Sequence, residues 1–241
     1  MMRSKLFVPG SRPEFFEKAM RSAADALTFD LEDGVAPAQK PAARRAIGDF
    51  LRGVDSQLGK LMIVRTNGVT HPDFAEDVDA VVSARLDYIS LPKLESADEV
   101  HRAVRALAEA EKRKGVDRAI GVLATVESPK GLRLAYEITS ADKRIAALQV
   151  GLADLFAPLR IERHAAALGP VRFAVKMAAA EAGVPAFNTV WTDGNDPGRH
   201  RQSRVLAQRE GHRVGTEGAR RRRAAGERGQ GRLHGRRPDG R

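Results

Sequence analysis

Short apolar segments alternate with amphipathic segments along most of the chain, and this alternation limits the fold more than any other feature of the sequence. Seven of the apolar segments are predicted strands, at residues 5–8, 26–31, 61–65, 88–91, 120–126, 147–150 and 186–191. They are rich in Val, Ile, Leu and Phe on both faces, which is typical of parallel strands buried on both sides of a sheet.

Predicted helices fill the intervals between these strands, at residues 13–22, 39–51, 72–83, 97–114, 130–139 and 170–182. The helix that starts at Ala97 is the best delimited. Ser96 and Glu99 form the pattern of a capping box before it, and Gly115 supplies a C-terminal stop.

Strict alternation of strand and helix predicts parallel βαβ units. Strands that recur every roughly 25–35 residues fit a (β/α)8 TIM-type barrel of about 250 residues, and an open doubly wound sheet is the alternative. A dinucleotide-binding version of the open sheet is rejected, because the first turn reads VPGSRP and has one Gly instead of a glycine-rich fingerprint. About seven βα units are recognisable, so the barrel is expected to be incomplete.

The C-terminal segment differs in composition from the rest of the chain. Residues 195–241 hold fourteen Arg, no Lys, nine Gly and five acidic residues, and therefore carry +9 of the net charge of +10. Such a composition cannot build a core. We expect an almost neutral barrel domain at residues 1–194, followed by a disordered basic tail at residues 195–241.

Composition also excludes several classes of protein. The chain has no Cys, which rules out disulfide frameworks, thiolate nucleophiles and cysteine-ligated metal centres. No apolar run approaches the roughly 18–20 residues that span a bilayer, and the N-terminus lacks the apolar stretch of a secretory signal. A cytoplasmic protein without a membrane partner is expected.

Polar residues follow the ends of successive predicted strands, which is where barrel enzymes place their chemistry. They are Asp30, Glu32 and Asp33 after the second strand, Arg65 after the third, Lys93 after the fourth, Glu127 after the fifth and Asp154 after the sixth. Acids without a nearby His or Cys favour Mg²⁺, which takes one or two carboxylates together with substrate and water oxygens. Arg65 offers a planar fork for a substrate carboxylate, so the set suits a 2-oxo or 2-hydroxy acid.

Each of these residues also has a structural interpretation. Asp30 or Asp33 alone fits a helix cap or a loop salt bridge about as well as a site. Arg65 could pair with Glu32, and Lys93 could be a solvated charge. The set is more informative than any member, and spacing alone does not fix the reaction.

Six short motifs follow one another between residues 3 and 155. They are RSKLFVPG at 3–10, DLEDGV at 30–35, VRTN at 64–67, LPK at 91–93, VESPKG at 126–131 and GLADL at 151–155. Together they resemble, over residues 2–193, the citrate lyase β-subunit-like branch of the HpcH/HpaI aldolase superfamily. The resemblance implies a TIM-type barrel that cleaves or forms a C–C bond in CoA thioesters such as citryl-CoA or malyl-CoA.

The resemblance also implies roles for individual residues. Glu127 and Asp154 are expected to bind Mg²⁺, and Arg65 is expected to hold the substrate carboxylate beside Glu127. Glu32 and Asp33 are expected to shape the catalytic surroundings. Arg3, Lys5 and Lys40 are the expected neighbours of the CoA phosphates. A homo-oligomer, trimeric or hexameric, is the expected assembly.

The chain departs from the family after residue 194. Family members continue with a helix, an eighth strand and often a lid, whereas this chain has NDPG at 195–198 and then Arg/Gly-rich sequence. A frameshift near residue 195 is our hypothesis for this change. Two alternatives to an active lyase therefore stay open: an inactive truncated family member, and a protein that binds nucleic acid non-specifically through its basic tail.

Overall fold

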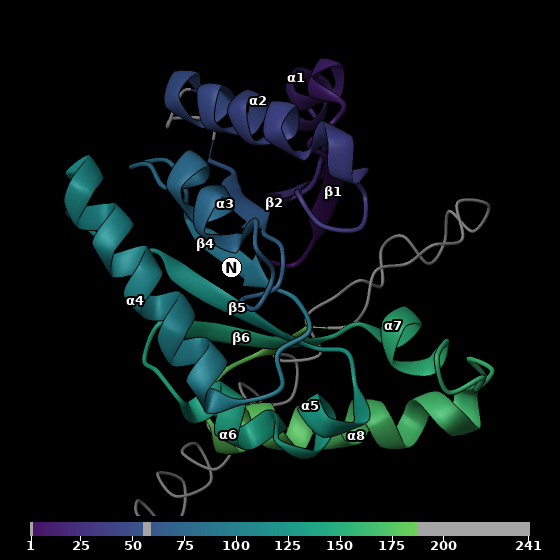
Figure 1. Ribbon diagram of the computed structural model, residues 1–241. Coiled ribbons are helices and arrows are strands. Elements are labelled where there is room, and N and C mark those ends of the chain that lie inside the picture. The colour runs from purple at the N-terminus through teal and green to yellow at the C-terminus, as the bar shows by residue number, and fades with distance from the viewer. Residues whose placement is uncertain (1, 55–58, 188–241) are drawn as a thin grey trace, which may run out of the picture. The chain divides into compact units, whose positions relative to one another are not determined.

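Seven strands pair in the order in which they occur along the chain, each parallel to the next (Figure 1). They are β1 (Lys5–Pro9), β2 (Ala26–Asp30), β3 (Leu61–Arg65), β4 (Tyr88–Leu91), β5 (Gly121–Val126), β6 (Ile145–Val150) and β7 (Ala186–Phe187). The computed structural model describes residues 2–54 and 59–187, all within one compact unit. The predicted incomplete TIM-type fold is confirmed as a curled parallel sheet of seven strands.

Helices cover the outer, convex face of this sheet (Figure 1). They are α1 (Phe16–Met20), α2 (Lys40–Gly53), α3 (Phe74–Val81), α4 (Ala97–Lys114), α5 (Pro129–Arg133), α6 (Ala135–Ser140), α7 (Leu152–Phe156) and α8 (Ala165–Glu181), with short 3₁₀ turns at Pro13–Phe15 and Pro37–Gln39. The main apolar core lies between these helices and the sheet, and Leu27 and Phe29 of β2 are fully buried in it.

The boundaries of α4 are those that the sequence predicts. The Ser96 hydroxyl accepts a hydrogen bond from the Glu99 backbone N–H at 3.3 Å, and Gly115 ends the helix with a φ of 64°. The Glu99 carboxylate reaches the backbone N–H of Glu95 at 2.8 Å, one residue before the position expected for a capping box.

Three predictions about helices are corrected. The segment at 130–139, predicted as one helix, forms two, α5 and α6, which are separated by Leu134. Helix α8 begins at Ala165, five residues before the predicted start, and runs through Pro170. The prediction took Pro170 as the first turn, where proline is best tolerated, but the Ala-rich segment before it is already helical. Helix α7 was not predicted, because five residues are too few to show a helical period.

The concave face of the sheet is layered from apolar to charged. Side chains alternate between the two faces of a strand, so every second residue lines the interior. Ala26, Ile63, Leu123 and Ala147 form a small apolar cluster low in the interior. Two residues further along their strands, Thr28, Arg65, Thr125 and Gln149 follow on the same face. The chemistry of the interior therefore changes towards the C-terminal strand ends.

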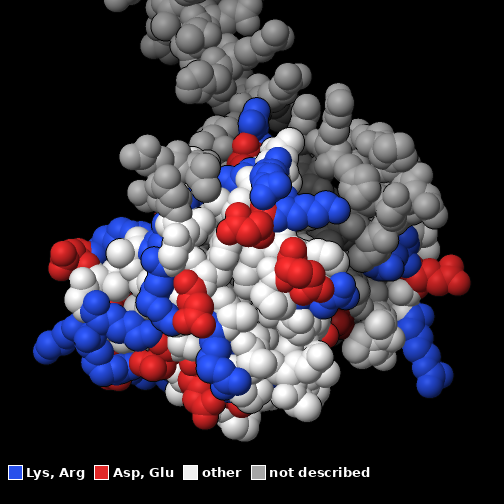
Figure 2. Space-filling model, turned by 90° about the horizontal axis from the view of Figure 1, so that it is seen from above, with Lys and Arg blue, Asp and Glu red and all other residues white. Residues whose placement is uncertain are grey.

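On the face that Figure 2 shows, the described residues mix both signs of charge, as expected for a nearly neutral body. No helix within residues 2–54 and 59–187 is long and apolar enough to cross a membrane. The predicted disorder, basic tail and frameshift concern residues 195–241, which lie outside the described residues.

Candidate functional site

The predicted site residues Glu32, Asp33, Arg65, Glu127 and Asp154 all follow or end a strand on the same edge of the sheet. Asp30 and Arg65 are the last residues of β2 and β3 and are direct register partners. Glu127 and Gly151 come directly after Val126 and Val150, which are register partners in β5 and β6. Parallel pairing thus brings side chains from four strands to one edge.

Arg65 is held by two carboxylates. Its Nε and Nη2 each donate to one oxygen of Asp30 at 2.7 Å, and its Nη1 forms an ion pair with Glu32 Oε2 at 2.7 Å. Burial opposes the charged form of Arg65, but the bonds and charges of Asp30 and Glu32 outweigh burial and raise its pKa. The guanidinium is therefore a fixed cation with a defined orientation.

Glu32 also contacts a cation from the next strand. Lys93 Nζ lies 2.8 Å from Glu32 Oε1 and 3.3 Å from Asp33 Oδ1. Burial raises the pKa of Glu32, although Arg65 and Lys93 oppose that rise. Lys93 has a φ of 54°, which is uncommon for a residue other than glycine. Both ion pairs place the Lys93 ammonium beside the acids of the site, although about half of its side chain is exposed to solvent.

Asp30 shapes the acidic turn in addition to orienting Arg65. Its carboxylate accepts hydrogen bonds from the backbone N–H groups of Glu32 at 3.0 Å and Gly34 at 2.9 Å. This pattern, in which an aspartate side chain bonds the backbone that follows it, stabilises a tight turn. A side chain at Gly34 would meet the Asp30 carboxylate. A larger residue at position 34 would therefore displace the Asp30 carboxylate from the turn.

Glu127 is the electrostatically unusual residue of the site. It is 7% exposed, and its Oε2 is buried without a hydrogen-bond partner among the described residues. Burial, with the charges of Glu32 and Asp154, raises the pKa of Glu127 to about 7. The side chain lies against Gly151, where a Cβ would be 2.6 Å from Glu127 Cγ.

Asp154 lies in the first turn of α7, half-buried, and is close enough for its charge to act on Glu127. No cluster of three or more His, Cys, Asp or Glu side chains arranged to hold a metal occurs within the described ranges. These two carboxylates are suitable ligands for a hard cation that takes its other ligands from substrate and water, because one of them has a buried oxygen without a hydrogen-bond partner among the described residues. Glu127 and Asp154 could therefore hold Mg²⁺.

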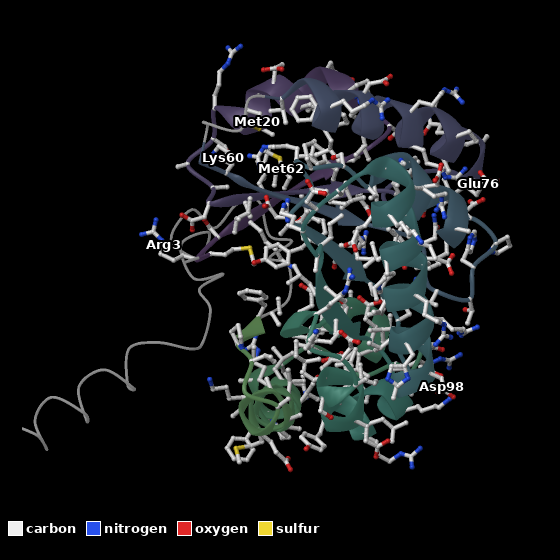
Figure 3. The ribbon with its side chains drawn as sticks, turned by 90° about the vertical axis from the view of Figure 1, so that its left-hand side faces the viewer. Arg3, Met20, Lys60, Met62, Glu76 and Asp98 are labelled. Atoms are coloured by element: carbon white, nitrogen blue, oxygen red, sulfur yellow. The ribbon has the colours of Figure 1, made fainter. Side chains whose placement is uncertain are left out.

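The structure places the three predicted phosphate neighbours at different points of the fold. Arg3 precedes β1 and pairs with Asp25 at 2.9 Å, and Figure 3 shows it at the opposite end of the sheet from Glu76. Lys40 is buried, and its ammonium is engaged by the carbonyls of Leu31 and Glu32. Neither residue offers free donors beside the acidic cluster.

Lys5 points into the interior of the sheet, where its ammonium contacts the side-chain oxygen of Gln149. This position does not suit a phosphate ligand at the mouth. The sequence signal that favoured these three residues was positive charge within a family-like motif, and charge alone does not report which way a side chain points.

Sequence reasoning left out three members of the site. Asp30, Lys93 and Gly151 all stand in the sequence motifs, which predict no role for them. Asp30 ends a buried strand, and that position was the available signal. The role of Gly151 depends on its contact with a side chain of the neighbouring strand, which no local pattern predicts.

The family model described as HpcH/HpaI aldolase/citrate lyase matches residues 3–220, so the match continues beyond residue 193, where the resemblance was expected to end. The citrate lyase subunit beta of Leuconostoc mesenteroides is 34% identical over 90% of this chain and 72% of its own length. The L-malyl-CoA/beta-methylmalyl-CoA lyase of Rhodobacter capsulatus is 41% identical over 65% of this chain. That match spans half of the relative's length.

A solved structure agrees with these relatives. The citrate lyase beta subunit of Mycobacterium tuberculosis, complexed with oxaloacetate and magnesium, superposes with a TM-score of 0.64 and is 36% identical, covering 78% of each chain. Sequence and fold thus lead to the same result, and this chain belongs to the HpcH/HpaI aldolase/citrate lyase family.

Proposed function

We propose that this protein is a Mg²⁺-dependent carbon–carbon lyase that acts on the CoA thioester of a short hydroxy acid. Support comes from its family and from two named relatives, a citrate lyase subunit beta and a malyl-CoA lyase. The choice between citryl-CoA, malyl-CoA and a related thioester is left open. The assembly of the active protein, for which we expect a trimer or hexamer, is likewise a prediction.

The single observation on which the proposal depends is Glu127 Oε2, a buried carboxylate oxygen without a hydrogen-bond partner among the described residues. A buried carboxyl with a pKa raised to about 7, near two other acids, is costly unless a cation joins it. In the proposal Glu127 and Asp154 hold Mg²⁺. When bound, the ion supplies Lewis-acid stabilisation for negative charge on a substrate oxygen.

Arg65 is the proposed anchor for the carboxylate of the acid half. Its hydrogen bonds to Asp30 use two of the five N–H donors of a guanidinium, and its Nη1 forms an ion pair with Glu32, so N–H donors remain for a ligand. Since both carboxylates fix its plane, Arg65 would meet the substrate without first losing conformational freedom. Lys93, which forms ion pairs with Glu32 and Asp33, adds a second cation at this edge of the sheet.

The proposed reaction cleaves the bond between the α carbon of the thioester and the carbinol carbon. The carbinol loses its hydroxyl proton and becomes the carbonyl of a 2-oxo acid. The electron pair of the broken bond passes to the α carbon as a thioester enolate, which takes up a proton to give the acyl-CoA. Charge that develops on the enolate and the carbonyl oxygen is what fixed cations at this edge would stabilise.

The test combines cleavage of malyl-CoA and citryl-CoA with Mg²⁺ binding measured by calorimetry. We expect cleavage with Mg²⁺ and none with a chelator. Glu127→Gln should abolish cleavage and weaken Mg²⁺ binding by an order of magnitude or more, because it removes one of two protein ligands. Glu111→Gln is the matched control, since Glu111 is equally buried but pairs with Arg144. Unchanged Mg²⁺ binding in Glu127→Gln would contradict the proposal.

A further inference from the structure

Lys5 extends from β1 into the interior of the curled sheet and contacts residues of the opposite strands. Its ammonium donates to the side-chain oxygen of Gln149 on β6 and lies 5.7 Å from the ring centre of Phe187 on β7. Gln149 in turn donates to Ser90 Oγ at 2.9 Å and to the Thr125 hydroxyl. The amine is therefore held in place by a polar layer below the charged edge.

The Lys5 ammonium and the Arg65 guanidinium both lie near the aromatic ring of Phe7. Lys5 Nζ lies 5.4 Å from the centre of the Phe7 ring, and Arg65 Cζ lies 5.5 Å from that centre. Both cations interact favourably with the ring, although they repel one another. Burial, with the charge of Arg65, lowers the pKa of Lys5 to about 8.

The two cations differ in how their charge is balanced. Arg65 is paired with Asp30 and Glu32, so most of its charge is already offset by carboxylates. No carboxylate oxygen of residues 2–54 or 59–187 forms an ion pair with Lys5, whose polar contact there is the neutral amide of Gln149. Arg65 is the charged group of the described elements that acts on Lys5 most closely. Lys5 therefore supplies positive charge that the site does not neutralise.

We propose that Lys5 is an electrostatic positioning residue, whose uncompensated charge beneath Arg65 favours binding of the anionic acid half of the substrate. The inference rests on the proposed function for the identity of that anion. Charge acts over longer distances in a water-poor interior than at a surface, so Lys5 need not touch the ligand. Arg65 fixes the orientation of the carboxylate, and Lys5 provides the net attraction.

Two variants separate charge from packing. Lys5→Met removes the charge and keeps much of the apolar stem, whereas Lys5→Arg keeps a charge that does not titrate. The probe is pyruvate with saturating Mg²⁺, and its binding is measured by calorimetry at pH 7 and pH 9. Methyl pyruvate, which carries no charge, is the matched ligand control.

At pH 7 we expect Lys5→Met to bind pyruvate about tenfold more weakly than the parent, the effect of one charge acting across roughly 12 Å at an effective dielectric constant of about 20. The parent should lose most of this advantage at pH 9, as Lys5 deprotonates, and Lys5→Arg should keep it. Binding of methyl pyruvate should be the same in all three proteins. Equal pyruvate binding by the parent and Lys5→Met at both pH values would overturn the inference.

A second readout does not depend on the proposed function. The unfolded chain holds its Lys5 proton up to a pKa of about 10.5, whereas the folded chain releases it near 8. The stability of the parent relative to Lys5→Met should therefore rise between about pH 8 and 10.5. If the difference in unfolding free energy between the parent and Lys5→Met did not change with pH, the inference would be overturned, because Lys5 would then not be a buried charge. Absence of pyruvate binding by the parent, with the pH-dependent rise present, would contradict the proposed function alone.

Discussion

Arg65 and Asp30 end adjacent parallel strands, and their side chains meet through two hydrogen bonds of 2.7 Å each. Asp30 also holds the turn that carries Glu32, the second partner of Arg65. One carboxylate therefore determines both the orientation of the guanidinium and the position of its other partner. This arrangement depends on the planar guanidinium of Arg65, which can form two parallel hydrogen bonds, as well as on its charge.

Replacement of Arg65 by Lys keeps the charge but loses the fork. We expect kcat/KM to fall by roughly one to three orders of magnitude, because a charge-assisted pair of about 1.5–3 kcal/mol is lost together with the fixed orientation. Steady-state kinetics with the active CoA thioester is the measurement. Arg144→Lys is the control, since Arg144 forms a comparable two-bond pair with Glu111 away from the site. An Arg65→Lys variant as active as the parent would show that Arg65 is structural.

The affinity for Mg²⁺ should depend on pH through Glu127. Its pKa is raised to about 7, so below that pH the ion must displace a proton from the carboxyl. We expect Mg²⁺ affinity to fall as the pH decreases from 8 to 6, and calorimetry in two buffers of different ionisation enthalpy should detect proton release near pH 7.

Metal-free protein gives the matching stability test. The folded pKa of Glu127 lies above its ordinary value of 4.5, so the folded state binds more protons between about pH 4.5 and 7. The stability of the parent relative to Glu127→Gln should therefore fall as the pH rises through this window. A difference that does not change with pH would contradict the raised pKa.

Lys40 should act on stability and not on CoA binding. Its ammonium donates to the carbonyls of Leu31 and Glu32 at 2.7 and 3.1 Å and to Asn67 at 2.5 Å. Lys40→Met should destabilise the fold by about 2 kcal/mol or more, because three buried acceptors lose a charged donor. Denaturant unfolding measures this loss. A large rise in KM for the CoA thioester without loss of stability would instead restore the expectation that Lys40 binds phosphate.

The strands were predictable because burial on both faces leaves a strong sequence signal. The first six end within one residue of the predicted ends and start within two residues of the predicted starts. Because the strands are parallel, their C-terminal ends lie at one edge of the sheet, and this alone predicts that Glu32, Arg65 and Glu127 lie there. Which residues pair there could not be predicted. That Lys40 turns inward, while Lys93 turns towards the acids, depends on contacts between segments far apart in sequence.

Gly151→Ala should weaken Mg²⁺ binding while leaving the fold intact. An added Cβ would lie 2.6 Å from Glu127 Cγ, so the carboxylate must move away from its position over β6. The backbone at residue 151 has a φ of −93°, which alanine adopts without strain. We expect at least a tenfold weaker Mg²⁺ affinity by calorimetry and a small change in stability. Gly53→Ala is the matched control, because nothing lies within 4 Å of its added Cβ at the end of α2. It should change stability little and leave Mg²⁺ binding unchanged. Equal Mg²⁺ affinity in both variants would show that the packing of Glu127 against Gly151 does not position the carboxylate.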